Sequence, residues 1–145
     1  MATEAEVLQD LLSKWISIAL EYAGSAPDVR AVYIYASSER GSSFVNAYFD
    51  QAGVVVFPED LKGTDTSKNR IRQVQRFLTE DLFEAEDRFK AANIPRPTEY
   101  RVYYESATKK LDSQLSRDEQ YGDDTDRTPI RGIEYWLGGR APKLY

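Results

Sequence analysis

Acidic side chains are concentrated in one short segment of this chain. Residues 112–126 hold six of the 24 carboxylates but only one of the 19 basic side chains, so this segment accounts for the whole net charge of −5. The six carboxylates are Asp112, Asp118, Glu119, Asp123, Asp124 and Asp126. Carboxylates gathered in this way can bind a cation, transfer protons or attract a positively charged partner.

The spacing of these carboxylates favours neither a metal site nor a catalytic pair. A calcium loop of the EF-hand type needs the register D-x-D-x-D-G and a glutamate at its twelfth position, and both are missing here. A catalytic pair needs surroundings that remove one carboxylate from water, which a hydrophilic loop containing glycine does not provide. We therefore expect no bound metal. A solvated loop without a specific role and a binding surface for a basic partner remain as interpretations.

The rest of the composition argues against catalysis. The chain has no histidine and no cysteine, so it lacks the commonest general base, the usual zinc ligands and the parts of a Ser-His-Asp triad. It also lacks a disulfide framework, a signal-peptide pattern and any apolar run of about 18 residues. We expect a protein that is not an enzyme, binds no cofactor, and lies in the cytoplasm without membrane attachment.

The acidic loop (residues 116–127) is the candidate binding surface. Its carboxylates would attract basic groups of a protein partner, while nearby aromatic residues would act as anchors. The candidate partner-binding residues are Asp118, Glu119, Tyr121, Asp123, Asp124, Asp126 and Trp136. A pI of about 4.9 argues against a nucleic-acid ligand, and the sequence contains no glycine-rich phosphate loop.

The elements that must position this loop follow from hydrophobic periodicity. One domain over residues 1–145 is expected, of α+β class, with an antiparallel sheet of about five strands, two long helices and a short C-terminal helix in the order α-β-β-β-α-β-β-α. Short connections force neighbouring strands to run antiparallel. The expected helices cover residues 3–23, 67–92 and 129–137, and the expected strands cover residues 29–37, 43–50, 53–57, 98–106 and 110–115.

Three details of this fold have specific expectations. The segment 129–137 suits a helix, since Thr128-Pro129 resembles a helix start, but a strand remains the alternative. In the last strand, Leu111 and Leu115 should point inward. In the first strand, Tyr33 and Tyr35 lie opposite the apolar face, so either both faces of the sheet are covered or the tyrosine face is free for a partner. A free tyrosine face would suit an adaptor or structural subunit that is not catalytic.

The order of elements and several sequence stretches resemble the YezG-like immunity proteins, which are bacterial antitoxins of polymorphic toxin systems. The resemblance extends over most of the chain, without one diagnostic motif. It rests on the N-terminal helix, the long charged helix, and the stretches Val32-Tyr33-Ile34-Tyr35-Ala36, Val45-Asn46-Ala47-Tyr48-Phe49, Lys110-Leu111-Asp112, Arg131–Trp136 and Leu137-Gly138. The last strand differs by lacking the family's repeated tyrosines, and the residues after it are unusually acidic.

The resemblance implies a complex that neutralises a cognate secreted toxin, which in this family is often a nuclease. Nuclease active sites are basic because they bind phosphates, so an acidic loop that covers one would imitate nucleic acid electrostatically. The resemblance supplies the class of partner, and the charge distribution independently indicates the surface. The identity of the toxin and the oligomeric state are left open by the sequence.

Overall fold

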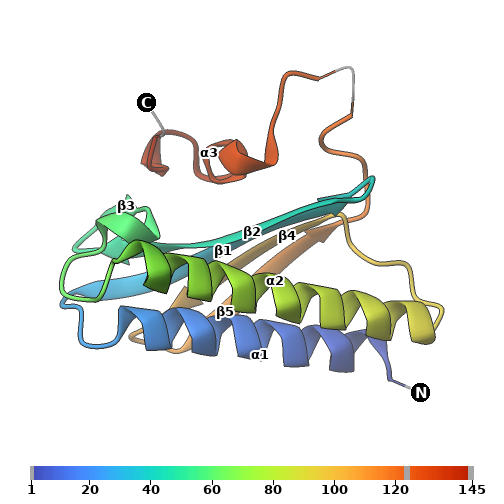
Figure 1. Ribbon diagram of the computed structural model, residues 1–145, viewed down its shortest axis with the longest axis horizontal. Helices are drawn as coiled ribbons and strands as arrows, with labels where there is room; N and C mark the ends of the chain where they lie inside the picture. The colour runs from blue at the N-terminus through green and yellow to red at the C-terminus, as the bar shows by residue number, and fades with distance from the viewer. Residues whose placement is uncertain (1, 123–124, 144–145) are drawn as a thin grey trace.

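The helices and strands of the computed structural model, which describes residues 2–122 and 125–143, follow the order expected from the sequence. The class is α+β, and the sheet, the paired helices and the C-terminal segment form three layers (Figure 1). The elements are α1 (Glu4–Ala23), β1 (Val29–Glu39), β2 (Ser42–Gln51), β3 (Val54–Val56), α2 (Lys68–Ala91), β4 (Glu99–Glu105), β5 (Lys110–Ser116) and α3 (Gly132–Leu137). Short 3-10 turns lie at Pro58–Asp60, Pro129–Arg131 and Gly138–Arg140.

Helix α1 begins with the capping box expected from the sequence. The hydroxyl of Thr3 accepts the backbone N–H of Glu6 at 3.2 Å, and the carboxylate of Glu6 accepts the backbone N–H of Thr3 at 3.2 Å. The apolar stripe of the helix is buried, and the indole of Trp15 donates to the carbonyl of Leu78 in α2 at 2.9 Å. This bond satisfies the polar atom of a fully buried tryptophan and joins the two helices.

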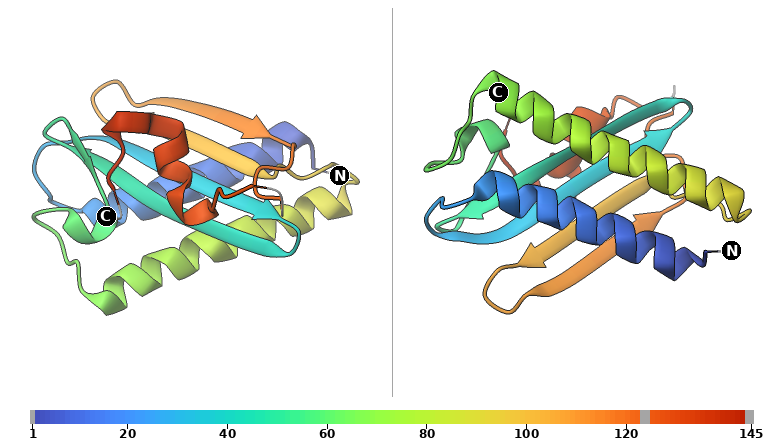
Figure 2. Two further views of the ribbon diagram at one scale, coloured as in Figure 1. Left: turned by 90° about the horizontal axis from the view of Figure 1, so that it is seen from above. Right: turned by 60° about the horizontal axis from the view of Figure 1, so that its bottom comes forward.

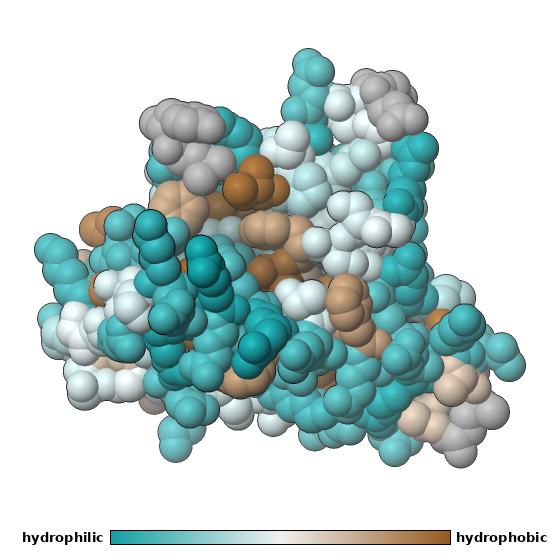
Figure 3. All heavy atoms as spheres, viewed as in Figure 1, coloured by the Kyte–Doolittle hydropathy of each residue, from teal (hydrophilic) through white to brown (hydrophobic). Residues whose placement is uncertain are grey.

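Helix α2 buries a narrow apolar stripe, and some of its charged side chains form ion pairs with α1. Lys14 of α1 lies 2.8 Å from Glu84, and Asp10 of α1 lies 2.8 Å from Arg88. The first pair gives a basic partner to Glu84, which lies in the acidic C-terminal half of α2, a location that the helix dipole disfavours for carboxylates. The outward surfaces of both helices are mainly hydrophilic, whereas hydrophobic residues gather between them and the C-terminal segment (Figure 3).

The sheet is antiparallel throughout, with strand order β3-β2-β1-β4-β5, so β1 lies in the centre. The face of the sheet that we call the first face packs against α1 and α2 and holds the main core. Its centre is made by Val32, Ile34 and Ala36 of β1, together with Val102 of β4. The first face is therefore a conventional apolar face under two amphipathic helices.

The opposite, second face is covered over β1 and β2 by the C-terminal segment (Figure 2). Tyr33 is only 4% exposed and Tyr35 is 0% exposed, because both lie beneath α3 and the turns that flank it. Both faces of the central strand are thus covered, and the alternative of a free tyrosine face is wrong for these two residues. Residues 129–137 are helical, first as a 3-10 turn and then as α3, which excludes the strand alternative.

Leu111 faces the helix side of the sheet, as the alternation predicts, but it is not buried there. Leu115 packs partly against the main core, but Leu111 is 42% exposed. The two leucines share the side of the sheet that faces the helices, since they pair with Tyr100 and Tyr104 of β4. Leu111 lies near the β4–β5 turn on the edge strand, where α1 no longer covers the sheet (Figure 2). Alternation sets which side a residue faces, but the reach of the covering helix sets its burial.

Candidate functional site

A buried carboxylate, Glu39, anchors the acidic loop to the sheet. Glu39 is the last residue of β1 and is 7% exposed. Its two carboxylate oxygens accept the backbone N–H groups of Gln120, at 2.9 Å, and Tyr121, at 2.7 Å. A carboxylate can be buried when such donors replace the water it has lost. The contact fixes the loop backbone from its inner side.

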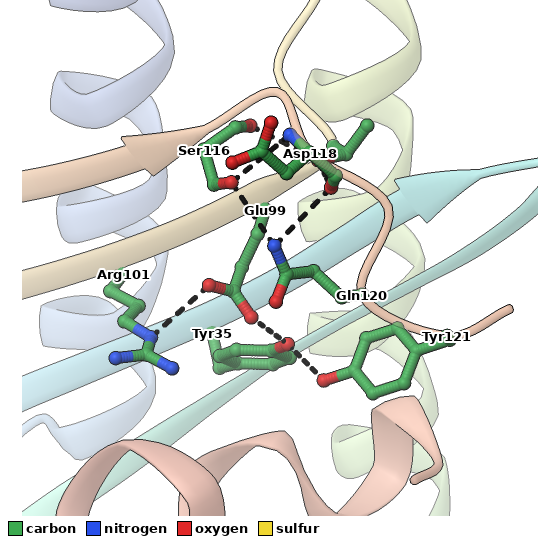
Figure 4. Close-up of polar contacts among 8 residues, drawn as sticks. Tyr35, Glu99, Arg101, Ser116, Asp118, Gln120 and Tyr121 are labelled. Atoms are coloured by element: carbon green, nitrogen blue, oxygen red, sulfur yellow. Dashed lines mark hydrogen bonds and ion pairs between the residues drawn. The ribbon is translucent and has the colours of Figure 1, made fainter. Parts of the chain in front are cut away.

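Tyr121 joins the loop to the centre of the sheet through a chain of hydrogen bonds (Figure 4). The hydroxyl of Tyr35 donates to Glu99 at 2.6 Å, so the hydroxyl of Tyr121 is left to donate to the oxygen of Tyr35. The second oxygen of Glu99 lies 3.3 Å from Nε of Arg101. Burial and then the bond to Glu99 raise the pKa of Tyr35 far above its usual range, and burial raises the pKa of Tyr121. Both phenols stay protonated at neutral pH and serve as donors.

The first turn of the loop is held by side chains that bind its backbone. The amide of Gln120 donates to the hydroxyl of Ser116 at 3.1 Å and to the carbonyl of Asp118 at 3.2 Å. The hydroxyl of Thr98 also donates to the carbonyl of Asp118, at 2.6 Å. Because these contacts use carbonyl, hydroxyl and amide groups, the carboxylates of Asp118 and Glu119 remain at the surface.

The far end of the loop is fixed to α3 by an arginine and two tyrosines. The guanidinium of Arg127 lies 4.3 Å from the ring centroid of Tyr135 and 5.7 Å from that of Tyr121. The backbone N–H of Thr128 donates to the hydroxyl of Tyr135 at 3.0 Å. The described ends of the loop are therefore held at two places: Glu39 at the end of β1 holds one, and Tyr135 of α3 holds the other.

The carboxylates of the predicted site that the structure describes all lie at the surface. Asp118, Glu119 and Asp126 are exposed, while Asp123 and Asp124 lie outside the described residues. Glu119 lies 3.7 Å from Arg40, in a pair whose two side chains are both about half exposed. An exposed pair of this kind contributes little to stability, so it leaves Glu119 available to a partner.

The two predicted aromatic anchors make contacts inside the chain. Tyr121 is partly buried and holds the loop, as described above. Trp136 is partly buried on the second face of the sheet, where its ring centroid lies 5.4 Å from that of Tyr33. The structure thus brings Tyr121 to the acidic loop and packs Trp136 against the tyrosine face. Contact of either ring with a partner stays a prediction.

Three residues that position the loop were not singled out from the sequence: Glu39, Glu99 and Gly132. Glu39 belongs to Glu39-Arg40-Gly41, which reads only as a turn, and Glu99 belongs to an alternating strand. Each carboxylate lies on the second face, four residues along its strand from a tyrosine of the same face, Tyr35 for Glu39 and Tyr103 for Glu99. That placement of charge among aromatic residues is the one sequence signal that could have indicated them.

A cavity of about 450 Å³ lies beside α3, over the part of the second face that the C-terminal segment leaves open. Its lining includes the aromatic rings of Tyr33, Tyr103 and Trp136 and the guanidinium groups of Arg101 and Arg140. Two of these lining residues are joined, since Arg140 donates to the hydroxyl of Tyr33 at 2.8 Å. Within residues 2–122 and 125–143, no group of three or more acidic side chains is arranged to hold a metal ion.

Comparison of the sequence with protein-family models and with curated proteins finds no match. The resemblance to YezG-like immunity proteins therefore stays a prediction. Among the helices of the described ranges, none has the length and apolar character that crossing a membrane requires.

Proposed function

We propose that this chain is an immunity protein, which binds a cognate toxin and neutralises it by covering a basic active site with the acidic loop. The observation that carries the proposal is the contrast between the two sides of this loop. Buried Glu39 holds the backbone of residues 120 and 121 from inside, while Asp118 and Glu119 project their charges outward. Residues held in this way lose little conformational entropy on binding, so more of their interaction energy appears as affinity.

The charge distribution supports the same proposal. Carboxylates that carry the entire net charge attract a basic surface from a distance and accelerate association. Since the rest of the chain is neutral, the loop also sets the orientation in which a basic partner approaches. The expected complex is tight and weakens as salt concentration rises, because salt screens exposed charges.

Protection against a toxin tests this proposal directly. The probe is the toxin encoded beside this chain, or the basic protein that co-purifies with it, expressed in bacteria with and without this chain. In the test variant the carboxylates at 118, 119, 123, 124 and 126 become amides. Association should slow and protection should be lost, with the fold retained by circular dichroism.

A matched control distinguishes loss of the loop carboxylates from a general change in net charge. Five exposed carboxylates elsewhere, Glu21, Glu59, Asp60, Glu80 and Asp87, are changed to amides in a second variant. The control should protect as well as the natural chain. Equal protection by both variants would reject the acidic loop as the binding surface.

The alternative function, an adaptor that binds a protein through the tyrosine-rich sheet face, has less support. It needs Tyr33 and Tyr35 at the surface, and both are buried under the C-terminal segment. The open remainder of that face is the cavity beside α3. Substitutions at Tyr103 that abolish binding, with the loop variant unaffected, would favour the adaptor.

A further inference from the structure

Strand β5 forms an open edge of the sheet. Among the described residues, no strand pairs with its outer side, and Figure 2 shows it along the border of the sheet in both views. Five of its seven residues, Lys110 to Gln114, are exposed. In an antiparallel edge strand, alternate residues direct their backbone N–H and C=O groups away from the sheet. The edge therefore offers a ladder of backbone donors and acceptors to another strand.

The opposite edge of the sheet does not offer a comparable ladder. Strand β3 has only three residues, Val54–Val56, and the chain then turns at Pro58. Short edge strands are a common way in which proteins prevent edge-to-edge pairing. Strand β5 is more than twice as long and contains no proline.

We propose that β5 pairs with β5 of a second copy of this chain, antiparallel, about a twofold axis at Ser113. All seven residues of the strand then have a partner, because the sequence Lys110–Ser116 is centred on Ser113. Leu111 lies opposite Leu115 of the second copy, and Asp112 lies opposite Gln114 of the second copy. The two sheets join into one continuous sheet of ten strands, with five from each copy.

The helix side of this pairing buries apolar surface that is exposed in the single chain. Leu111 is 42% exposed and is the one large hydrophobic residue of β5 left in the open among the described residues. Its partner in the pairing is a second leucine, and the contact occurs twice because of the twofold symmetry. Apolar cross-strand pairs of this kind contribute to the stability of a sheet.

The charges at the two ends of β5 favour the antiparallel arrangement. Lys109 and Lys110 lie where the strand begins, and after the strand ends Arg117, which already pairs with Glu4, is followed by the acidic residues Asp118 and Glu119. An antiparallel second copy brings the basic end of one strand towards the acidic end of the other. A parallel copy would place like charges side by side.

The charges also select the register. Moving the twofold axis to residue 112 would place Asp112 opposite Asp112 of the second copy, and moving it to residue 110 would oppose two lysines. Like charges directly opposite each other destabilise a sheet. Within residues 110–116 the axis at Ser113 opposes no like charges and pairs the largest number of residues, and the one like-charge pair just beyond the strand, Lys109 with Arg117, involves an arginine that already pairs with Glu4.

Sedimentation velocity over a wide range of protein concentration tests the proposal. The natural chain should show a monomer–dimer equilibrium that shifts towards monomer as salt is added. The variant Gln114→Glu places a new carboxylate opposite Asp112 of the other copy, twice in the dimer. The dimer dissociation constant should rise roughly two- to thirtyfold, which corresponds to two like-charge pairs.

Two further variants distinguish this effect from loss of folding or from added charge. Gln114 lies opposite Arg101 in the same sheet, so a carboxylate at position 114 suits the single chain. The control Gln73→Glu adds the same charge on α2, where Gln73 already accepts from Arg70 at 2.6 Å, and should not change the dissociation constant. The double variant Asp112→Lys with Gln114→Glu restores opposite charges and should restore the dimer.

Three outcomes would overturn the pairing. The first is that the natural chain stays monomeric at every protein concentration. This outcome also covers the case in which β5 pairs with a strand of the toxin and not with a second copy. The second is a dimer that Gln114→Glu and Gln73→Glu affect equally. The third is failure of the double variant to recover dimer formation. Each outcome is independent of toxin protection, so this test and the test of the proposed function can fail separately.

Discussion

Gly132 lies directly against the aromatic ring of Tyr35. A β-carbon at position 132 would be 2.0 Å from Cε2 and 2.3 Å from Cζ of that ring, which is far inside van der Waals contact. Only glycine lets the start of α3 approach the central strand this closely. The same tyrosine bonds to Glu99 and Tyr121, so the close approach of Gly132 sets the C-terminal segment beside the residues that hold the loop.

Substitution of Gly132 by alanine should therefore loosen the C-terminal segment. The overlap with a fully buried tyrosine forces α3 away from the sheet and should reduce the free energy of unfolding by about 1–3 kcal/mol. Limited proteolysis should cut residues 121–143 faster than in the natural chain. Gly139→Ala is the matched control, because nothing lies within 4 Å of a β-carbon there. Equal resistance of the two variants would contradict this role of Gly132.

Glu39→Gln should release the inner side of the acidic loop. The amide presents an N–H₂ group to one of the two backbone donors at Gln120 and Tyr121, so at least one buried donor loses its acceptor, at a cost of about 1–3 kcal/mol. Hydrogen exchange at these two amides should accelerate. The exposed Glu21→Gln serves as the control. Unchanged exchange in the Glu39 variant would show that the carboxylate does not hold the loop.

The tyrosine pair should respond unequally to loss of its hydroxyl groups. Tyr35→Phe leaves an oxygen of buried Glu99 and the hydroxyl of Tyr121 without their partner, at an expected cost of about 1–3 kcal/mol. Tyr121→Phe leaves the bond between Tyr35 and Glu99 intact and should cost at most about 1 kcal/mol. Urea unfolding of both variants measures the difference. A larger loss for Tyr121→Phe would reverse the direction assigned to this chain of hydrogen bonds.

Stability should fall in strongly alkaline solution because several tyrosines are buried. Burial raises the pKa of Tyr22 to about 12 and raises the pKa of Tyr35, Tyr48 and Tyr100 further. A raised pKa in the folded state means that ionisation favours the unfolded chain. The contribution is complete below about pH 10, where unfolded tyrosine titrates, and is lost as the pH rises through the folded pKa. Each such tyrosine adds a slope of up to about 1.4 kcal/mol per pH unit.

Tyrosinate absorbance and urea unfolding measure this effect. Both are followed between about pH 8 and pH 11, because an ordinary tyrosine has a pKa of about 10. These four tyrosines should ionise only with unfolding, after the less buried tyrosines of the chain. If all ten tyrosines of the chain ionised together with the fold intact, the burial of these four in solution would be refuted.

Periodicity in the sequence was sufficient to predict the class, the order of elements and the first face of the sheet. The capping box at Thr3 and the stripe of α2 are local patterns, because a helix places residues three and four apart on one side whatever lies around it. Alternation likewise placed Val32, Ile34 and Ala36 together. The acidic loop is also a property of the sequence alone, since its charge does not depend on the fold.

Only the tertiary structure decided how the loop is held and what covers the tyrosines. Glu39 and Tyr121 are 82 residues apart, and Tyr35 and Gly132 are further apart still, so their contacts arise when the C-terminal segment folds back over the second face. Local patterns say which side of a strand a residue faces, but they do not say which distant segment packs there. The same reason left Leu111 exposed although its alternation is that of a core residue.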